Sequence, residues 1–305
     1  LNYNSFILRI VKVNFMFEHF KDKNSNVNGI NIHYKIGGEG YPLLLLHGYP
    51  QTHVMWRKIV PDLSKKYTVV CPDLRGYGDS AKPPSDSKHY NYSKKVMSQD
   101  QSELMKSLGF DKYIVIGHDR GARVAHRMGI DFSENIEKII LMDIVPTNHV
   151  FENTEQILAT KYYHWFFLIQ KHPFPEKMIG NDPEFYLRSK LTMWGINKDY
   201  MSEEIIKEYL RCFKNSETIR ASCEDYRAGA TIDIKHHNID RHKKINCPLL
   251  ILWGKQGTVE KLYDPIEVWK HWGSNVEGES IDCGHFLPEE KPRETCGKII
   301  EFIES

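Results

Sequence analysis

The sequence predicts an α/β fold in which a mostly parallel, doubly wound sheet is covered by helices on both faces. Short apolar runs at residues 43–46, 113–116 and 136–142 have the length and composition of strands that are buried on both faces. Helical patterns follow these runs, and strand and helix alternate along most of the chain. This alternation is typical of a parallel sheet, because each crossover between parallel strands passes over one face of the sheet, usually as a helix.

The 305 residues carry almost no net charge, since 41 Lys and Arg residues face 40 Asp and Glu residues and give +1. This balance offers no electrostatic basis for binding nucleic acid or an anionic membrane surface, so we expect a small-molecule partner. The six cysteines are scattered without a Cys-x-x-Cys pair. We therefore expect reduced thiols in a cytoplasmic protein, without a disulfide framework or a zinc knuckle.

The beginning of the chain does not have the pattern of a signal peptide. Residues 6–13 are apolar but broken by charges, and no small-residue cleavage site follows them. No uninterrupted apolar run approaches the length of a membrane span. The chain begins with Leu1, whereas Met16 opens a more ordinary start, so residues 1–15 are either translated upstream sequence or an appendage.

The first half of the chain is predicted to alternate regularly. Residues 27–36 form a hairpin that turns at Asn28-Gly29, a dipeptide typical of tight hairpin turns. The buried strand at 43–46 then runs into the loop His47-Gly48-Tyr49-Pro50. The elements expected next are a helix through Trp56 and Leu63, a strand at 67–72, a helix at 93–108, the strand at 113–116 with its following helix, and the strand at 136–142.

The alternation stops between Pro146 and about Arg241. This segment has a helical pattern, is rich in aromatic residues and contains several prolines. A helical insertion after a sheet strand should lie over the C-terminal edge of the sheet as a cap. The alternation resumes with a strand at 248–254, a helix around 266–272, a strand at 277–281 and a helix at 293–303. We therefore expect a core of residues 16–146 and 241–305 and a helical cap of residues 147–240.

A Gly-x-Asp-x-Gly sequence joins the strand at 113–116 to the helix that follows it. Gly117 and Gly121 flank the turn, where side chains would collide with the neighbouring strand and helix. The pattern is that of a nucleophile elbow with aspartate in place of serine, and it places Asp119 above the sheet at a helix N-terminus. A purely structural turn is the alternative for this motif when it is considered alone.

A hydrolase of this layout needs a nucleophile, an acid and a histidine in that chain order. Asp119, Asp143 and His285 supply that order, with Asp143 after the strand at 136–142 and His285 after the last strand. The other usual place for the acid lies just past Trp253-Gly254, where the first carboxylate is Glu260. We therefore expect Asp143 to orient His285. A helix cap for Asp143 and an ordinary loop histidine are the structural alternatives.

An aspartate nucleophile implies a particular reaction. A carboxylate attacks saturated carbon and would leave an alkyl ester on Asp119. His285 would then draw a proton from the water that hydrolyses this ester. The backbone N–H groups of Tyr49 and Arg120 are placed to hold the oxyanion of the second step. Haloalkanes, haloacids and epoxides are suitable substrates for such chemistry.

Two arginines favour one of these substrate classes over the others. Arg120 and Arg123 lie three residues apart on one helix and share a face beside Asp119. Such a pair forms a clamp for a carboxylate, so we predict a small acid as substrate. An uncharged haloalkane or epoxide would gain nothing from two positive charges beside its reacting carbon. The alternative is an ordinary pair of arginines on a helix surface.

The predicted cap contributes hydrogen-bond donors of the kind that a departing halide needs. His164, Trp165 and Tyr226 carry an imidazole, an indole N–H and a phenol O–H that can converge on an anion. Core packing is the ordinary account of Trp165. We expect no metal, because the histidines of the 235–244 linker lack a fourth ligand, and no cofactor, because the glycines at 37–40 precede no Gly-Lys-Ser/Thr.

From about Met16 to its C-terminus the chain resembles the haloacetate (fluoroacetate) dehalogenases of the α/β-hydrolase superfamily. The matching motifs are His47-Gly48-Tyr49-Pro50-Gln51-Thr52, Asp73-Leu74-Arg75-Gly76-Tyr77-Gly78-Asp79-Ser80, His118-Asp119-Arg120-Gly121-Ala122-Arg123, Asp143-Ile144-Val145-Pro146-Thr147, Tyr163-His164-Trp165, Asp225-Tyr226-Arg227-Ala228-Gly229 and Gly284-His285-Phe286. The first two are shared by many relatives. The Asp-Arg-Gly-x-Arg elbow together with His164-Trp165 and Tyr226 is specific. Haloalkane dehalogenases and many epoxide hydrolases carry tryptophan after the nucleophile, and Arg120 departs from both.

The resemblance implies an α/β-hydrolase fold and a role for each matching residue. Asp119 would be the nucleophile, His285 the base and Asp143 its partner. By the same resemblance Arg120 and Arg123 would bind the carboxylate, His164, Trp165 and Tyr226 the halide, and Trp194 would line the pocket. Family members tend to be homodimers, so a homodimer is expected. Asn148 departs from the aromatic residue that many relatives carry near the entrance.

We therefore predict hydrolytic dehalogenation of a short 2-haloacid, with haloacetate and water giving glycolate and halide. An epoxide hydrolase or another hydrolase with an aspartate nucleophile is the enzymatic alternative. It would need cap tyrosines to polarise an epoxide oxygen, and Tyr226 is the clear candidate. A small-molecule receptor built on a hydrolase fold is the alternative from another class, but here every catalytic position is filled.

Overall fold

The computed structural model describes residues 17–196 and 198–305. The possible appendage at residues 1–15 therefore lies outside the described residues. Within the described ranges, none of the helices combines the length and the apolar character that crossing a membrane requires.

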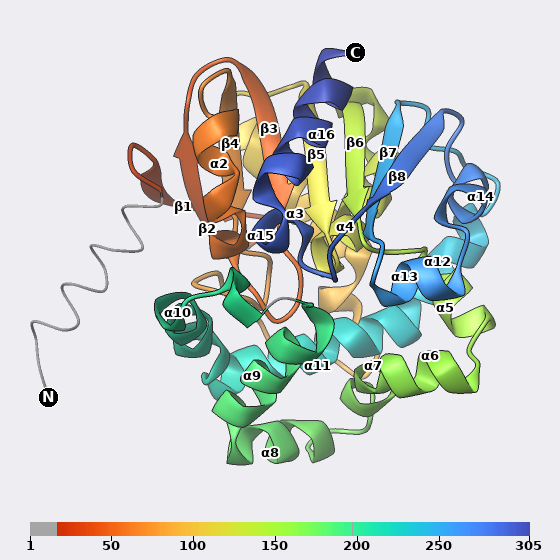
Figure 1. Cartoon of the computed structure of the whole chain (residues 1–305). Helices are drawn as coiled ribbons and strands as arrows, with labels where there is room; N and C mark the ends of the chain where they lie inside the picture. The colour runs from red at the N-terminus through yellow and green to blue at the C-terminus, as the bar shows by residue number, and fades with distance from the viewer. Residues whose placement is uncertain (1–16, 197) are drawn as a thin grey trace, which may run out of the picture.

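The core is a twisted sheet whose strands are mostly parallel, as predicted (Figure 1). Its strand order is β1-β2-β4-β3-β5-β6-β7-β8, in which β1 and β2 run antiparallel to their neighbours and the other adjacent strands pair in parallel. The bounds are β1 Lys21–Val27, β2 Ile30–Gly37, β3 Tyr41–Leu46, β4 Tyr67–Pro72, β5 Tyr113–His118, β6 Ile136–Met142, β7 Leu249–Gly254 and β8 Val276–Ile281. The central strands β3, β5 and β7 are buried along nearly their whole length, which explains their continuous apolar sequences.

The hairpin between β1 and β2 turns at the predicted dipeptide. Asn28 and Gly29 both have positive φ, 49° and 75°, as a two-residue hairpin turn with the hand of the sheet twist requires. Asn28 Nδ2 also donates to Asp100 Oδ1 at 2.7 Å, which attaches the turn to the following helix layer.

Helices cover both faces of the sheet, with α3 and α4 on one face and α2 and α16 on the other (Figure 1). The bounds are η1 His53–Lys58, α2 Val60–Leu63, η2 Tyr90–Tyr92, α3 Lys94–Ser107, α4 Arg120–Asp131, η3 Ser133–Asn135, α13 Thr258–Leu262, α14 Pro265–Lys270, α15 Leu287–Glu290 and α16 Pro292–Glu304. The single helix expected through Trp56 and Leu63 is two short helices, η1 and α2. Pro61 has no N–H to continue the first helix, so a new one begins around it.

Between β6 and β7 the described chain is helical. The bounds are α5 Thr147–Glu152, α6 Gln156–Lys161, α7 Tyr163–Leu168, α8 Phe174–Asn181, α9 Pro183–Trp194, η4 Lys198–Tyr200, α10 Glu203–Phe213, α11 Ser216–Ala230 and α12 Ile232–Asp240. We call residues 147–240 the cap segment. Figure 1 shows α6–α11 gathered at the end of the sheet where β5 passes into α4, which is the carboxyl end of the parallel strands. The division of the chain into a core domain and a cap domain stays a prediction.

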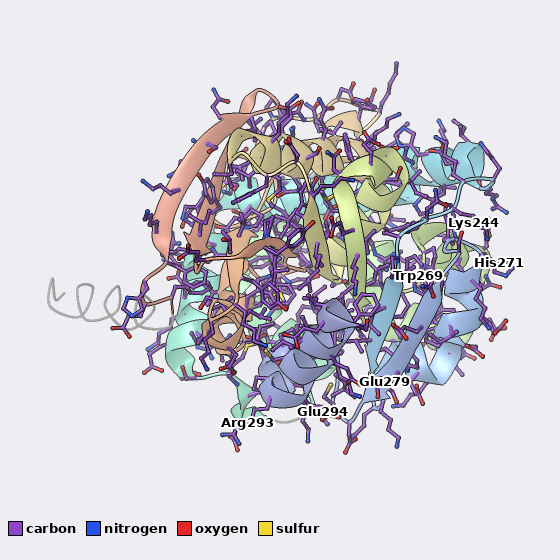
Figure 2. All side chains as sticks on the ribbon, turned by 90° about the horizontal axis from the view of Figure 1, so that it is seen from above. Lys244, Trp269, His271, Glu279, Arg293 and Glu294 are labelled. Carbon is purple, nitrogen blue, oxygen red and sulfur yellow. The ribbon has the colours of Figure 1, made fainter. Side chains whose placement is uncertain are left out.

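Figure 2 shows Trp269, Lys244 and His271 at the edge of the molecule near β7 and β8. Trp269 is fully buried, and its Nε1 donates to the carbonyl of Ile144 at 3.0 Å. Lys244 and His271 lie at the surface, where Lys244 Nζ donates to the His271 carbonyl at 2.7 Å. The bond from Trp269 anchors α14 to the segment that directly follows Asp143, so this helix helps to fix the end of β6.

Candidate active site

Asp119 lies on the turn between β5 and α4, as the Gly-x-Asp-x-Gly sequence predicts. Its backbone has φ 48° and ψ −114°, a region that side chains other than glycine rarely adopt. The flanking glycines allow this sharp turn. A Cβ on Gly117 would lie 2.6 Å from Ala122 Cα, and a Cβ on Gly121 would lie 2.2 Å from the carbonyl oxygen of Leu46. Strain concentrated at one residue in this way is typical of functional sites.

The Asp119 carboxylate is 8% exposed and has one oxygen held in place. Its Oδ1 accepts the backbone N–H of Tyr49 at 2.8 Å, from the loop after β3. The other oxygen, Oδ2, has no hydrogen-bond donor among the described residues. Burial by itself would raise the pKa of Asp119, but the positive charges of His285 and of the nearby arginines outweigh it and lower the pKa. The carboxylate is therefore ionised at neutral pH.

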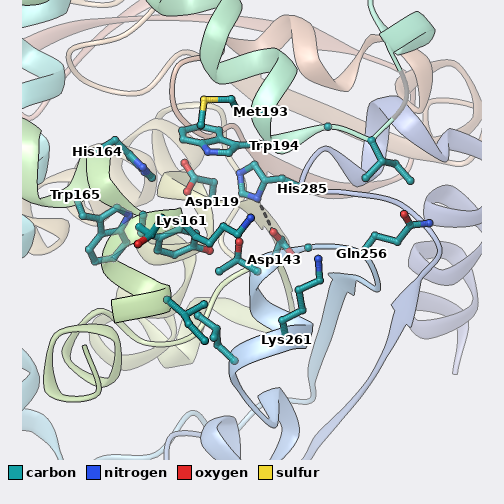
Figure 3. A pocket seen from close by; sticks show the side chains of 18 of the residues that line it. Asp119, Asp143, Lys161, His164, Trp165, Met193, Trp194, Gln256, Lys261 and His285 are labelled. Carbon is teal, nitrogen blue, oxygen red and sulfur yellow. Dashed lines mark hydrogen bonds and ion pairs between the residues drawn. The ribbon is translucent and has the colours of Figure 1, made fainter. Parts of the chain in front are cut away.

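His285 and Asp143 form a close pair beside Asp119 (Figure 3). Nδ1 of His285 lies 2.5 Å from Asp143 Oδ2, and Asp143 Oδ1 accepts the backbone N–H of Gly254 at 3.0 Å. Asp143 thus directly follows β6 but is hydrogen-bonded to Gly254 at the end of β7. The other usual place for the acid lies just past this glycine, where the sequence has no carboxylate before Glu260. Burial acts to lower the pKa of His285, but the hydrogen bond and the charge of Asp143 raise it overall.

The two arginines of α4 have different surroundings. Arg123 lines the cavity, and its Nη1 donates to neutral acceptors, the carbonyl of Val145 at 3.0 Å and Thr147 Oγ1 at 2.9 Å. Arg120 is 1% exposed and is not among the cavity-lining residues. Its Nε and Nη2 donate to the two carboxylate oxygens of Asp225 at 2.9 and 2.7 Å. Neither guanidinium group faces bulk solvent, which excludes the reading of two ordinary helix-surface arginines.

The predicted halide donors come together from α7 and α11 of the cap segment, and the predicted pocket residue Trp194 of α9 lies beside them. The His164 ring lies 4.6 Å from that of Trp194 and 5.7 Å from that of Tyr226, and Trp165 lies 6.0 Å from Tyr226, measured between centroids. The Tyr49 ring packs against Tyr226 at 5.3 Å. Three polar atoms of these cap side chains, His164 Nδ1, Trp194 Nε1 and Tyr226 Oη, are buried and have no hydrogen-bond partner in the described part of the chain. A cluster of buried, unpaired donors suits an anion that arrives during the reaction.

A cavity of about 360 Å³ lies between the core and the cap segment. Its lining includes Asp119, Arg123, Asp143 and His285 from the core and Tyr162, His164, Trp165 and Trp194 from the cap segment. Lys161 of α6 and Lys261 of α13 also line it (Figure 3). Tyr49, Arg120 and Tyr226 are not among the lining residues, but each packs against one of them: Tyr49 against Trp194, Arg120 against Trp165 and Tyr226 against His164. A space of this size accommodates a small molecule.

Sequence reasoning missed several residues that the structure places around the site. His118 Nε2 contacts the carbonyl oxygen of His285 at 2.7 Å and so supports the loop that carries this histidine. Burial, and next His285, lower the pKa of His118 to about 3, so this ring is neutral and donates that hydrogen bond. Asp225 belongs to the motif of residues 225–229, from which the sequence analysis predicted only Tyr226 as a site residue. Nothing in the sequence indicated that Lys190 is buried, because a lysine on a helix is normally exposed.

Lys190 lies on α9, fully buried and without a carboxylate partner among the described residues. Its Nζ donates to Tyr163 Oη and lies 3.7 Å from the centroid of the Tyr163 ring, 5.2 Å from that of Tyr186 and 5.4 Å from that of Trp194. Burial lowers the pKa of Lys190 from 10.5 to about 7. The aromatic residues around it offset part of the cost of burying a charge, since cation–π contacts are favourable.

Lys190→Met is expected to stabilise the protein at acidic pH. Between pH 7 and 10.5 the unfolded chain keeps a proton on Lys190 that the folded protein has released, so the free energy of unfolding of the wild type rises with pH. Below pH 7 the cost of burying the ammonium group is felt in full. We expect the variant to exceed the wild type by about 2 kcal/mol at pH 6 and by almost nothing near pH 10, as measured by urea unfolding. Lys177→Met, at an exposed position of α8, is the control, and an equal effect of both changes at all pH values would contradict the interpretation.

Within the described residues, one group of side chains has the spacing of a metal site, namely His33, His53 and Asp73, all buried. Asp73 already accepts four N–H groups, from the rings of His33 and His53 and from the backbones of His53 and Asp79, at 2.8 to 2.9 Å. Its carboxylate therefore stabilises the loop that follows β4. His237, from the histidines that the sequence analysis set aside, contacts Asn148 Oδ1 through Nδ1 at 2.9 Å.

The fold and the arrangement of Asp119, His285 and Asp143 define the class of protein as an α/β hydrolase. Comparison with known proteins agrees, because residues 41–292 match the family model described as alpha/beta hydrolase fold. A solved α/β hydrolase structure from Nostoc sp PCC 7120 is 49% identical, with a TM-score of 0.93 over 94% of this chain and 99% of that chain. Cfl2 from Burkholderia cenocepacia is 26% identical, with a TM-score of 0.86 over 93% of this chain and 96% of that chain.

Two relatives with assigned activities identify a family within the α/β hydrolases. A fluoroacetate dehalogenase of Burkholderia sp is 40% identical over 289 residues, which are 94% of this chain and 95% of that protein. A soluble epoxide hydrolase of Corynebacterium sp. (strain C12) is 36% identical over 282 residues, 91% of this chain and 95% of that protein. The chain belongs to the haloacetate dehalogenase family of the α/β-hydrolase superfamily, as the motifs of its sequence predicted.

Proposed function

We propose that this protein is a hydrolytic dehalogenase of short 2-haloacids, which converts haloacetate and water into glycolate, halide and a proton. The observation that carries the proposal is the position of Asp119. Its carboxylate lines a small cavity together with the paired His285 and with Arg123, which forms no ion pair with a carboxylate among the described residues. The relationship to the fluoroacetate dehalogenase of Burkholderia sp supports the same substrate class.

In the first step the carboxylate oxygen of Asp119 attacks the carbon that bears the halogen. Tyr49 N–H holds Oδ1, so Oδ2 is the oxygen that is free to attack. A carbon–oxygen bond forms while the carbon–halogen bond breaks, and the halide leaves with the bonding electron pair. His164, Trp194 and Tyr226, each with an unpaired buried polar atom, would donate hydrogen bonds to the departing anion, together with Trp165, which the sequence predicted as a donor. Burial, and next Lys190, lower the pKa of His164 well below its usual value, so its ring is neutral and donates through one nitrogen.

In the second step water hydrolyses the ester on Asp119. His285 takes a proton from the water, and the oxygen attacks the carboxyl carbon of Asp119, so that glycolate leaves and the free carboxylate returns. Asp143 fixes the ring of His285 with Nε2 available for this proton and stabilises the imidazolium that forms. Tyr49 N–H is already in place to hold the oxyanion, and Arg120 N–H, at the N-terminus of α4, is the proposed second donor.

The cap segment would act as the lid over this chemistry. It would supply the halide donors, and its residues line the cavity beside Asp119, where they would limit the access of bulk water. We retain the cytoplasmic location and the homodimer as predictions.

Epoxide hydrolysis is the second candidate. The relationship to the Corynebacterium enzyme favours it. The partly buried Tyr162 lines the cavity and the buried Tyr226 packs against the lining residue His164, so a phenol is available to polarise an epoxide oxygen. The buried guanidinium group of Arg123 is evidence against epoxide hydrolysis. An epoxide carries no charge to offset a buried guanidinium group, whereas a carboxylate does so.

The purified protein should be incubated separately with fluoroacetate, chloroacetate and styrene oxide while halide and diol are measured. The proposal predicts halide and glycolate in equal amounts from at least one haloacetate and no diol. Diol without halide would replace the dehalogenase by the epoxide hydrolase. Neither product, from protein that binds chloroacetate, would favour a receptor without catalysis.

A further inference from the structure

A single buried carboxylate of the cap segment collects three donors from the core. Asp225 of α11 is fully buried and accepts hydrogen bonds from Arg120, from Tyr77 Oη at 2.6 Å and from Lys94 Nζ. These donors come from three elements: the loop after β4, the start of α3 and the start of α4. Asp225 is therefore the point at which the cap segment is attached to the turn that carries Asp119.

The charges around Asp225 balance one another. Arg120 and Lys94 are the cations, and Asp225 and Asp233 are the anions, with Lys94 Nζ 3.6 Å from Asp233 Oδ2. All four side chains are buried. Burial would raise the pKa of Asp225, but the charges of Arg120 and Lys94 lower it, so the carboxylate is ionised. The charge of Arg120 is thus already offset inside the protein.

Among the described residues Arg123 forms no ion pair with a carboxylate, although the charge of Asp119 acts on it from a greater distance. Its hydrogen-bond acceptors, Val145 O and Thr147 Oγ1, are uncharged, and its guanidinium carbon lies 4.6 Å from the Trp165 ring centroid. Burial, and next the charge of Arg120, lower the pKa of Arg123 to about 10. A guanidinium group with a lowered pKa is one whose positive charge is poorly compensated. A bound carboxylate would supply the missing negative charge at this arginine.

Arg120 retains one free donor in spite of its ion pair. The Nε and Nη2 edge grips Asp225, so the remaining nitrogen, Nη1, is at the opposite end of the guanidinium plane and has no acceptor within the described residues. The guanidinium carbon lies 4.2 Å from the centroid of the Tyr226 ring, which limits its rotation. A buried guanidinium N–H without an acceptor is costly, and an arriving acceptor removes that cost.

We propose that Asp225 is a positioning residue that fixes Arg120 so that its Nη1 donates one directional hydrogen bond to the substrate carboxylate, while Arg123 supplies the compensating charge. This inference rests on the proposed acid substrate. The two arginines then have separate tasks, and Asp225 controls the binding of the acid without touching it. Substrate binding and attachment of the cap segment depend on the same carboxylate.

The test measures binding rather than turnover. In a protein that carries Asp119→Asn, calorimetry gives the affinities for chloroacetate and for its uncharged analogue chloroacetamide, before and after the further change Asp225→Asn. The proposal predicts that the affinity for chloroacetate falls about 10- to 100-fold, the value of one hydrogen bond to a charged group. The affinity for chloroacetamide should change less than about threefold. Equal losses for both ligands, or no loss for either, would overturn the positioning role.

Two further variants keep this test decisive. Asp225→Asn leaves Arg120 and Lys94 with Asp233 as their one anion, and the variant could fail to fold. Combining it with Lys94→Met restores the charge balance, and the same loss for the acid alone is expected. Asp79→Asn breaks an exposed bridge between the core and Arg211 of the cap segment at 2.6 Å and should leave both affinities unchanged. If the Asp119→Asn protein shows this pattern of affinities but the wild-type protein releases no halide from chloroacetate, the proposed function is refuted and the role of Asp225 stands.

Discussion

Asp119→Asn is expected to lower dehalogenase turnover by about 10⁴-fold or more while the acid still binds. The amide has the shape of the carboxylate and can still accept the N–H of Tyr49 through Oδ1, but it lacks the negative oxygen that attacks carbon. Arg123 is unchanged in this variant, so calorimetry should give a dissociation constant for chloroacetate within about tenfold of the wild-type value. Steady halide release by a variant verified as amide by mass spectrometry would contradict the nucleophilic role.

The wild-type protein offers an independent control for the same step. One turnover in heavy-oxygen water, with enzyme in excess over chloroacetate, should place the heavy oxygen in the side chain of Asp119 and not in glycolate. The reason is that water attacks the carboxyl carbon of the ester, so the oxygen that glycolate carries away comes from the aspartate. Label in the glycolate of the first turnover would show that water attacks the substrate directly, with Asp119 acting as a base.

His285→Gln is expected to stop the reaction halfway. The first step needs only the ionised Asp119 and the halide donors, whereas the second needs a base to take a proton from water. The variant should release one halide per active site and then stall, with turnover lowered by about 10³-fold or more. Mass spectrometry of a peptide that contains Asp119 should detect one added carboxymethyl group. Continued halide release at the wild-type rate would exclude His285 as the base.

Asp143→Asn is expected to slow the second step without stopping it. The amide can still hold the ring of His285, but it removes the charge that raises the pKa of this histidine. The base acts only in its neutral form, so the rate of ester hydrolysis rises as the pH increases through the pKa of His285. Losing Asp143 should therefore shift this limb of the pH profile to lower pH and reduce the maximal rate. A profile without a shift would mean that the pair at 2.5 Å does not set the protonation of His285.

Local patterns were sufficient for most of the core. The strand at 136–142 was predicted at the bounds of β6, and the helix at 93–108 matches α3 together with its capping residue Ser93. These successes have a common cause: a strand buried on both faces must be apolar throughout, and a helix N-terminus needs a side chain that accepts its free N–H groups. The helix through Trp56 was predicted less well, because Pro61 divides it in two.

The surroundings of the candidate site were harder to predict. The bond between Arg120 and Asp225 joins residues that are 105 positions apart, and no periodicity connects them. The arginine pair was expected to act as one symmetrical clamp, yet a partner from the cap segment distinguishes Arg120 from Arg123. Lys190 could not be inferred either, since its burial depends on how α9 packs against α7 and on the three aromatic rings around its Nζ.

The order and type of the core elements, the aspartate on its strained turn and the chain order of Asp119, Asp143 and His285 follow from the sequence alone, because periodicity, glycine spacing and strand ends are local properties. Only the tertiary structure decided which of the two arginines keeps an uncompensated charge, which donors lie unpaired in the cap segment and how large a ligand the cavity admits. Charge compensation and burial depend on every group within a few ångströms, and those groups come from distant parts of the chain.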